Sequence, residues 1–231
     1  MTAMSISDAA TRIEETLTAV FASAARIGDH ARTIWESAVD APSVRDLEVL
    51  QPTIFAELDA NAHYVGGGFL VEPGALSDAN RYLEWWQKDA SGSHSRLVLD
   101  LDPRRPDGYD YVTMDWYVGA KAGTPTVRGP YLDYAGADGF IFTFASPVTA
   151  GGRFIGTGGA DVLVTALDPL LFDQIRTGPE SLALVDRDGR VIVSNSPDSA
   201  PSERLRPRSV ENAIAIGGEG VGWRLCTLTS R

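Results

Sequence analysis

The sequence predicts an α+β fold in which a long N-terminal helix packs on an antiparallel sheet, followed by a smaller β-rich module. Apolar residues recur at helical spacing through residues 5–39. From residue 63 onward, short strand-like segments are separated by turns that contain glycine and proline. These segments do not alternate regularly with helices, which argues against a doubly wound parallel sheet.

The first helix is predicted for residues 5–39 because its apolar residues are spaced by three, four and seven positions, which places them on one face. Ser5 or Ser7 is the expected N-terminal cap, and the segment 41–43 contains a proline that ends the helix. A shorter helix follows, and its apolar face consists of Leu47, Leu50, Ile54 and Leu58.

The central segments have the composition of strands. Residues 63–71 form a glycine-rich strand, a pattern typical of a bend or of a ligand that approaches the backbone closely. Two more strands are expected at 82–86 and 95–100 with a turn at 89–93, and residues 102–108 are rich in residues that break regular structure. A short helix is predicted for residues 115–122.

The second half of the chain is predicted to consist mainly of hairpins. A strand begins near residue 127, and two long strands at 139–147 and 153–164 are joined by a glycine-bearing turn. The remaining predicted elements are a short helix at 168–175 and strands at 182–186, 190–194, 213–216 and 222–228.

Composition excludes several classes of function. The net charge of -11 disfavours nucleic acid and anionic membranes as partners, because binding to phosphates needs a basic surface. The single cysteine and three scattered histidines give no metal-binding motif, and no cofactor is expected. The glycine run 156–160 lies inside a predicted strand with no helix after it, so it does not read as a nucleotide loop. No familiar catalytic motif is present, so we expect a protein that is not an enzyme.

The sequence contains neither a secretory signal pattern nor an apolar run long enough to span a bilayer. Taken as a whole natural chain, it is therefore expected to be cytoplasmic; taken as an excised fragment, it gives no such expectation.

Aromatic and acidic residues alternate between residues 109 and 161. Aromatic faces and carboxylates together suit an ammonium group, through cation–π attraction and charge-assisted hydrogen bonds. A chance grouping of core aromatics with surface acids remains an alternative at this point. Upstream, Trp85 and Trp86 are adjacent in a predicted strand, so only one of them should face the core.

The order of several motifs resembles the Cache family of sensor domains. These motifs are Trp116-Tyr117, the segment 129–133, the strand 140–148, and the segments 152–156 and 159–161. The resemblance covers roughly residues 6–184, and residues 182–196 look like the start of the second module of a double Cache domain, here shortened. It implies a PAS-like sheet and the domain boundaries 1–60, 61–177 and 178–231.

The resemblance also implies a set of ligand-binding residues. By motif position, Tyr109 matches the first tyrosine of the amino-acid sensors in the family, and Trp116 and Tyr117 match their Trp-Tyr pair. The Tyr-x-Asp motif corresponds to Tyr131 and Asp133. A final carboxylate corresponds to Asp161, and in those sensors the last three positions hold the ligand's amino group. Tyr111 is an alternative to Tyr109, because both lie in one extended segment.

The chain departs from this pattern at Met114, where the family's amino-acid sensors carry the arginine that engages the ligand carboxylate. A thioether cannot replace a guanidinium group. We expect Met114 to form a pocket wall and Asp115 to add a further negative group. With these residues the chain resembles the amine-recognising branch of the family more than its amino-acid sensors.

The resulting expectation is a stand-alone sensor of a small cationic amine or quaternary ammonium compound. It would signal through a partner protein or by rearrangement of a homodimer formed through the N-terminal helix. Three alternatives stay open: a degenerate Cache domain that serves for dimerisation or interaction, a sensor of an amino acid or carboxylate, and an enzyme with an unfamiliar site.

Overall fold

The computed structural model describes residues 5–176 and 180–229. They fold into helices and antiparallel strands, which confirms the predicted α+β class. The chain divides into two compact units, one running from Val20 to Val164 and the other combining the chain up to Ala19 with the chain from Thr165 onward. No helix in the described ranges is long and apolar enough to cross a membrane.

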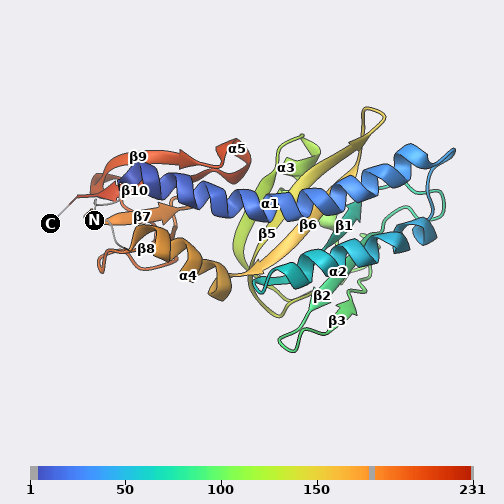
Figure 1. Ribbon diagram of the computed structural model, residues 1–231, viewed down its shortest axis with the longest axis horizontal. Coiled ribbons are helices and arrows are strands. Elements are labelled where there is room, and N and C mark those ends of the chain that lie inside the picture. The colour runs from blue at the N-terminus through green and yellow to red at the C-terminus, as the bar shows by residue number, and fades with distance from the viewer. Residues whose placement is uncertain (1–4, 177–179, 230–231) are drawn as a thin grey trace. The chain divides into compact units, whose positions relative to one another are not determined.

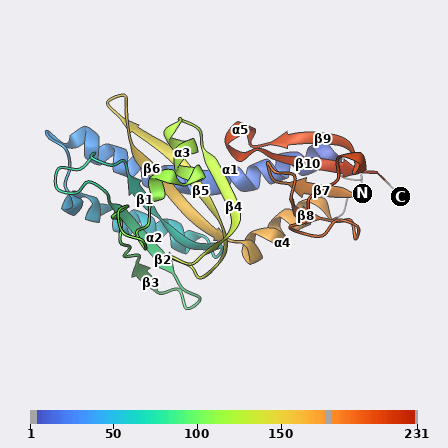
Figure 2. The same cartoon turned by 180° about the vertical axis from the view of Figure 1, so that it is seen from behind.

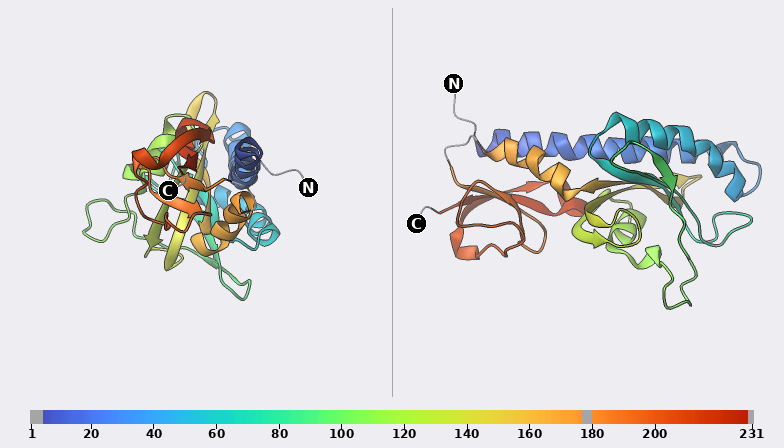
Figure 3. Two further views of the ribbon diagram at one scale, coloured as in Figure 1. Left: turned by 90° about the vertical axis from the view of Figure 1, so that its left-hand side faces the viewer. Right: turned by 90° about the horizontal axis from the view of Figure 1, so that it is seen from below.

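The unit formed by residues 20–164 is built on a six-stranded antiparallel sheet with the strand order β3-β2-β1-β6-β5-β4 (Figure 1). Its strands are β1 (Tyr64–Val71), β2 (Leu83–Lys88), β3 (His94–Arg96), β4 (Thr126–Asp133), β5 (Gly139–Ala150) and β6 (Arg153–Leu163). In this unit α1 (Ile6–Ser37) and α2 (Gln51–Ala60) lie on one face of the sheet, and α3 (Asp115–Lys121) lies on the other (Figure 3). Short 3-10 helices cover Val44–Leu50 and Tyr111–Thr113.

The other unit contains a four-stranded antiparallel sheet with the order β8-β7-β10-β9 (Figure 2). Its strands are β7 (Leu182–Val185), β8 (Val191–Ser194), β9 (Val210–Ile216) and β10 (Trp223–Leu228). In addition to the start of α1, its helical segments are α4 (Val164–Ile175), a 3-10 turn at Pro207–Ser209 and α5 (Gly218–Val221). The predicted boundary at residues 177 and 178 lies outside the described residues, and the predicted three-part division stays a prediction.

Glycines in β6 let helix α1 pack directly against the sheet. A Cβ atom at Gly158 would lie 2.1 Å from the carbonyl oxygen of Ala24 and 2.9 Å from the amide nitrogen of Gly28, both in α1. The glycine run therefore lies in a strand, as predicted, and the small size of Gly158 serves helix packing.

One predicted strand is shorter than expected. Of residues 95–100, only the first two belong to β3, and residues 97–110 form an irregular segment. A backbone hydrogen bond of 2.9 Å from Leu97 to Trp85 fixes its start, and one of 2.7 Å from Tyr109 to Asp100 closes it. Leu97 and Leu99 are partly buried while Val98 between them is exposed. That alternation resembles a strand, which is why the sequence pattern predicted one.

Candidate ligand-binding pocket

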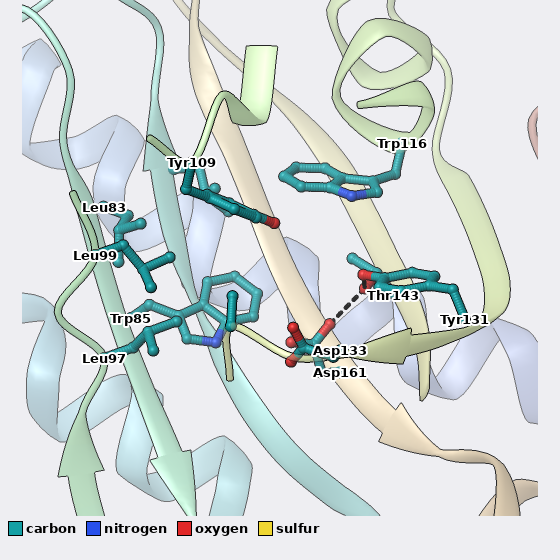
Figure 4. A pocket seen from close by; sticks show the side chains of 12 residues that line it. Leu83, Trp85, Leu97, Leu99, Tyr109, Trp116, Tyr131, Asp133, Thr143 and Asp161 are labelled. Atoms are coloured by element: carbon teal, nitrogen blue, oxygen red, sulfur yellow. Dashed lines mark hydrogen bonds between the residues drawn. The ribbon is translucent and has the colours of Figure 1, made fainter. Parts of the chain in front are cut away.

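A small pocket lies on the α3 face of the six-stranded sheet, within the unit formed by residues 20–164 (Figure 4). Its cavity volume is about 30 Å³. The residues that line it come from strands β1, β2, β4, β5 and β6, from helix α3, and from two irregular segments. They are Leu70, Leu83, Trp85, Leu97, Leu99, Tyr109, Trp116, Tyr131, Asp133, Ala135, Thr143 and Asp161.

Asp161 in β6 is the buried carboxylate of this pocket, with 9% of its surface exposed. The hydroxyl group of Thr143 donates a hydrogen bond of 2.6 Å to its Oδ1 atom. The Tyr131 hydroxyl lies 2.5 Å from the same threonine oxygen. Because the threonine proton is directed at Asp161, the tyrosine is the donor to the threonine. The three groups form a chain of hydrogen bonds that ends on the carboxylate.

The carboxylate of Asp133 lies beside that of Asp161 in the pocket (Figure 4). Asp133 ends β4, and its two oxygens accept hydrogen bonds from backbone amides of the following turn. These are the amide of Gly136 at 3.2 Å and the amide of Ala137 at 2.8 Å. An aspartate that caps its own turn in this way holds one orientation, so the turn fixes the carboxylate at the pocket.

Burial raises the pKa of one of the two carboxyl groups, that of Asp161. Desolvation of Asp161 raises the pKa of its carboxyl group to about 7; the Thr143 hydrogen bond opposes this shift and the neighbouring charge of Asp133 adds to it. A cation in the pocket would favour the ionised form and lower that pKa. The site is therefore electrostatically suited to a positive ligand.

Aromatic rings surround the carboxylates. They are contributed by Trp85, Tyr109, Trp116 and Tyr131 (Figure 4). Burial, together with the nearby Asp161 charge, raises the pKa of the phenol groups of Tyr109 and Tyr131, so both hydroxyls stay neutral at physiological pH. Neutral ring faces next to carboxylates form the environment in which proteins hold ammonium groups.

Leucines form the remaining wall. Leu83, Leu97 and Leu99 lie together on the side of the pocket occupied by the Trp85 ring (Figure 4), and Leu70 also lines the cavity. The described lining residues include two carboxylates and no positively charged side chain. The pocket thus has an acidic end and an aliphatic end.

Of the residues proposed from the sequence, Tyr109, Trp116, Tyr131, Asp133 and Asp161 line this pocket. The remaining three, Met114, Asp115 and Tyr117, do not. Tyr117 is fully buried in the adjacent core, where its hydroxyl donates a 2.7 Å hydrogen bond to Glu72. Met114 is the N-terminal cap of α3, and the Asp115 side chain is 84% exposed and lies 3.9 Å from Arg128.

Two ambiguities of the sequence have clear outcomes in the structure. Tyr109 lines the pocket, whereas Tyr111 is fully buried and donates a 2.6 Å hydrogen bond to the carbonyl oxygen of Val71. Trp85 faces the pocket, whereas Trp86 on the opposite face of β2 donates to Glu84 and packs edge-on against Phe55.

Sequence reasoning missed the leucines and Thr143, and it left the role of Trp85 open. Thr143 pairs with Asp161 across β5 and β6, a relation that requires the strand register. Leu97 and Leu99 come from the irregular segment, which the sequence pattern had assigned to a strand. The alternation of Trp85 and Trp86 was a usable signal, but it did not say which face carried the pocket.

Comparisons with solved structures identify the fold. The extracellular domain of a protein assigned as a histidine kinase superposes with a TM-score of 0.64 at 16% identity, covering 96% of this chain and 89% of that chain. The ligand-binding domain of the Campylobacter jejuni chemoreceptor Tlp3, solved with 4-methylisoleucine, gives a TM-score of 0.63 at 15% identity, covering 97% and 87%. The chain therefore has the fold of Cache-like domains, which confirms the fold that the resemblance implies.

A third structure with the Cache fold is the ligand-binding domain of the Pseudomonas aeruginosa amino acid chemoreceptor PctB, solved with L-arginine. Its TM-score is 0.58 at 14% identity, covering 96% of this chain and 91% of that chain. In sequence, the chain is 30% identical over 129 residues to the methyl-accepting chemotaxis protein McpA of Pseudomonas putida. The match covers 51% of this chain and spans a fifth (20%) of that receptor. No family model matches the chain.

These comparisons contradict the cytoplasmic location expected from the sequence. The histidine-kinase neighbour is an extracellular domain, and the two other structures named above are ligand-binding domains of chemoreceptors. The expectation rested on the lack of a signal or membrane pattern within this stretch of sequence. Such a lack does not determine the compartment in which a Cache domain works.

Proposed function

We propose that the chain is the sensor module of a signalling protein, and that its pocket binds a small cationic ligand, an amine or a quaternary ammonium compound. The observation that carries this proposal is the pair of carboxylates, Asp133 and Asp161, beneath four aromatic rings, with no positive side chain among the described lining residues. The ligand would supply the missing positive charge.

The energetic reason is the cost of a buried charge. Removing a carboxylate from water without a partner costs several kcal/mol, of which hydrogen bonds recover a part. Asp161 has the Thr143 hydroxyl as a donor, and Asp133 has two backbone amides. A bound cation adds the charge compensation that these neutral donors cannot give.

Amino acids fit this pocket less well than amines. Tlp3 and PctB were solved with amino acids, whose carboxylates need a cationic or strongly donating partner. Here the position that matches the family's arginine is Met114, which caps α3 outside the pocket lining. The chemistry of the lining supports recognition of the amino end alone.

Signal transfer would use protein contacts. McpA is a chemotaxis receptor, and one solved neighbour belongs to a protein assigned as a histidine kinase. By analogy, ligand binding in this Cache domain would change its contacts with the rest of a receptor or with a regulatory partner, without chemical conversion of the ligand. A homodimer through α1 remains part of this proposal.

A thermal-shift screen with amines, amino acids and carboxylates tests the proposal. A ligand that binds only the native state raises Tm by mass action. At a ligand concentration of a hundred times Kd, it increases the free energy of unfolding by about 2.7 kcal/mol. We expect amines to raise Tm and Asp161→Asn to abolish the shift. The matched control is Asp173→Asn on α4, where the side chain is 62% exposed and pairs with Arg176 outside the pocket. Stabilisation by carboxylates or amino acids, with none by amines, would contradict the proposal. Stabilisation by none of the three groups would favour a module that serves only for interaction.

A further inference from the structure

The pocket is chemically polarised along its length. Both carboxylates lie together at one end, and Leu83, Leu97 and Leu99 lie at the other (Figure 4). A ligand with its charged group between the aspartates must therefore direct its opposite end toward leucine side chains. The nature of that wall determines what the opposite end of the ligand can be.

The acidic end accommodates one positive group. Asp133 and Asp161 occupy the same end of the cavity (Figure 4), so they are placed to share a single ammonium and not to hold two separated ones. Asp133 already accepts two backbone hydrogen bonds, and Asp161 accepts one from Thr143. The ring of Trp85 spans from the leucines to this end, with its indole nitrogen directed at the carboxylates (Figure 4).

The aliphatic end offers no partner to a second polar group. Of the described lining residues, the leucines and Ala135 have no polar side-chain atom, and the polar ones gather around the carboxylates. A second ammonium or a carboxylate placed against the leucines would lose its hydration without gaining a hydrogen bond. Methylene and methyl groups placed there would gain from burial.

We infer that the ligand is a monoamine: a singly charged ammonium compound with a compact apolar body, and neither a diamine nor an amino acid. This inference rests on the proposed function and narrows it to one class of ligand. It makes the leucine wall the specificity determinant and the aspartate pair the anchor.

Calorimetric titration with two matched pairs of ligands tests the inference. Butylamine is compared with 1,4-diaminobutane, and 3-methylbutylamine is compared with L-leucine, which has the same skeleton plus a carboxylate. We expect each monoamine to bind at least about tenfold more tightly than the compound with the second polar group. A polar group buried without a hydrogen-bond partner weakens binding by roughly that factor or more.

A substitution in the leucine wall should reverse the preference. Leu97 is half-buried in the irregular segment 97–110, so Leu97→Asp changes the pocket wall with less risk to the core than a change in β1 or β2. We expect Leu97→Asp to bind 1,4-diaminobutane more tightly than butylamine, because the new carboxylate supplies the missing partner. Val98→Asp is the matched control, since Val98 is 83% exposed and should leave the preference unchanged.

The outcomes separate the two levels of the proposal. If 1,4-diaminobutane or L-leucine binds the unsubstituted protein as tightly as its monoamine partner, the inference is wrong while the cationic sensor stands. If amines of both kinds fail to bind, the proposed function fails and the inference with it. Leu99→Asp is a second variant at the same wall. Folded variants at both leucines that still prefer butylamine would show that this wall does not set specificity.

Discussion

In the proposed site, Asp161 is the residue whose protonation would compete with ligand binding. Its carboxyl group is buried next to Asp133 and the phenols of Tyr109 and Tyr131, and its pKa is raised to about 7. An aspartate in the unfolded chain has a pKa of about 3.9. Between these two values the folded state holds a proton that the unfolded state lacks. The contribution of this group to the free energy of unfolding therefore decreases as pH rises from about 4 to about 7.

Ligand affinity should change with pH in the opposite sense. A cation pairs with the ionised form of Asp161, whereas an alkylamine stays protonated throughout this range. We expect the affinity for 3-methylbutylamine to be about tenfold weaker at pH 6 than at pH 8, as one proton competes with the ligand. Titrations between pH 6 and pH 8 measure this change in affinity. The control variant Asp173→Asn should give the same pH profile as the unsubstituted protein. An affinity that does not vary between pH 6 and pH 8 is incompatible with Asp161 as the anchor.

Single residues also show why motif matching located part of the pocket and missed part. Trp116 and Tyr117 are neighbours on a helix, where successive side chains point about 100° apart, so both could not face one small cavity. Trp116 lines the pocket, and Tyr117 lies in the core against Phe154. A motif preserves the order of residues along the chain. The direction of each side chain depends on how α3 packs on the sheet.

At the scale of elements, periodicity predicted most helices and strands, because burial on one face imposes it. Helix α1 is the best example: it was predicted for residues 5–39 and spans Ile6–Ser37. The irregular segment 97–110 is an exception, because its pattern predicts a strand that does not form. It buries alternate residues as a strand does, but after the backbone hydrogen bond from Leu97 to Trp85 in β2 it runs as irregular structure and closes on itself through the bond from Tyr109 to Asp100. Its leucines reach the pocket through tertiary contacts that no local pattern encodes.

The packing of α1 on β6 allows a test at this scale. Gly158→Ala would place a Cβ atom 2.1 Å from the Ala24 carbonyl oxygen, so α1 must move or the strand must shift. We expect a loss of about 1–3 kcal/mol in the free energy of unfolding, as for other overpacked cores. Denaturant unfolding measures this loss. Gly67→Ala in neighbouring β1 is the control, because its Cβ atom would lie no closer than 3.4 Å to any neighbour and should change stability little. Equal stability of the two variants would show that this close approach does not constrain α1.

At the scale of the whole molecule, the chain joins a sheet unit that carries the pocket to a second, smaller unit built on a four-stranded sheet. The order of elements and the motif resemblance predicted the Cache fold, and structural neighbours confirm it across nearly the whole chain. Localisation could not be deduced in the same way. Composition and the absence of a pattern describe only the stretch of chain at hand, whereas the fold links it to extracellular sensor domains.

In the proposed function, the pocket recognises a positive charge that Asp133 and Asp161 hold. The most direct test is calorimetric titration with 3-methylbutylamine and with 3-methylbutanol, which has nearly the same shape but no charge. We expect the amine to bind and the alcohol to bind at least about a hundredfold more weakly, since the alcohol loses both the charge-assisted hydrogen bonds and the cation–π contacts. Binding of the alcohol as tight as that of the amine would contradict the proposed function.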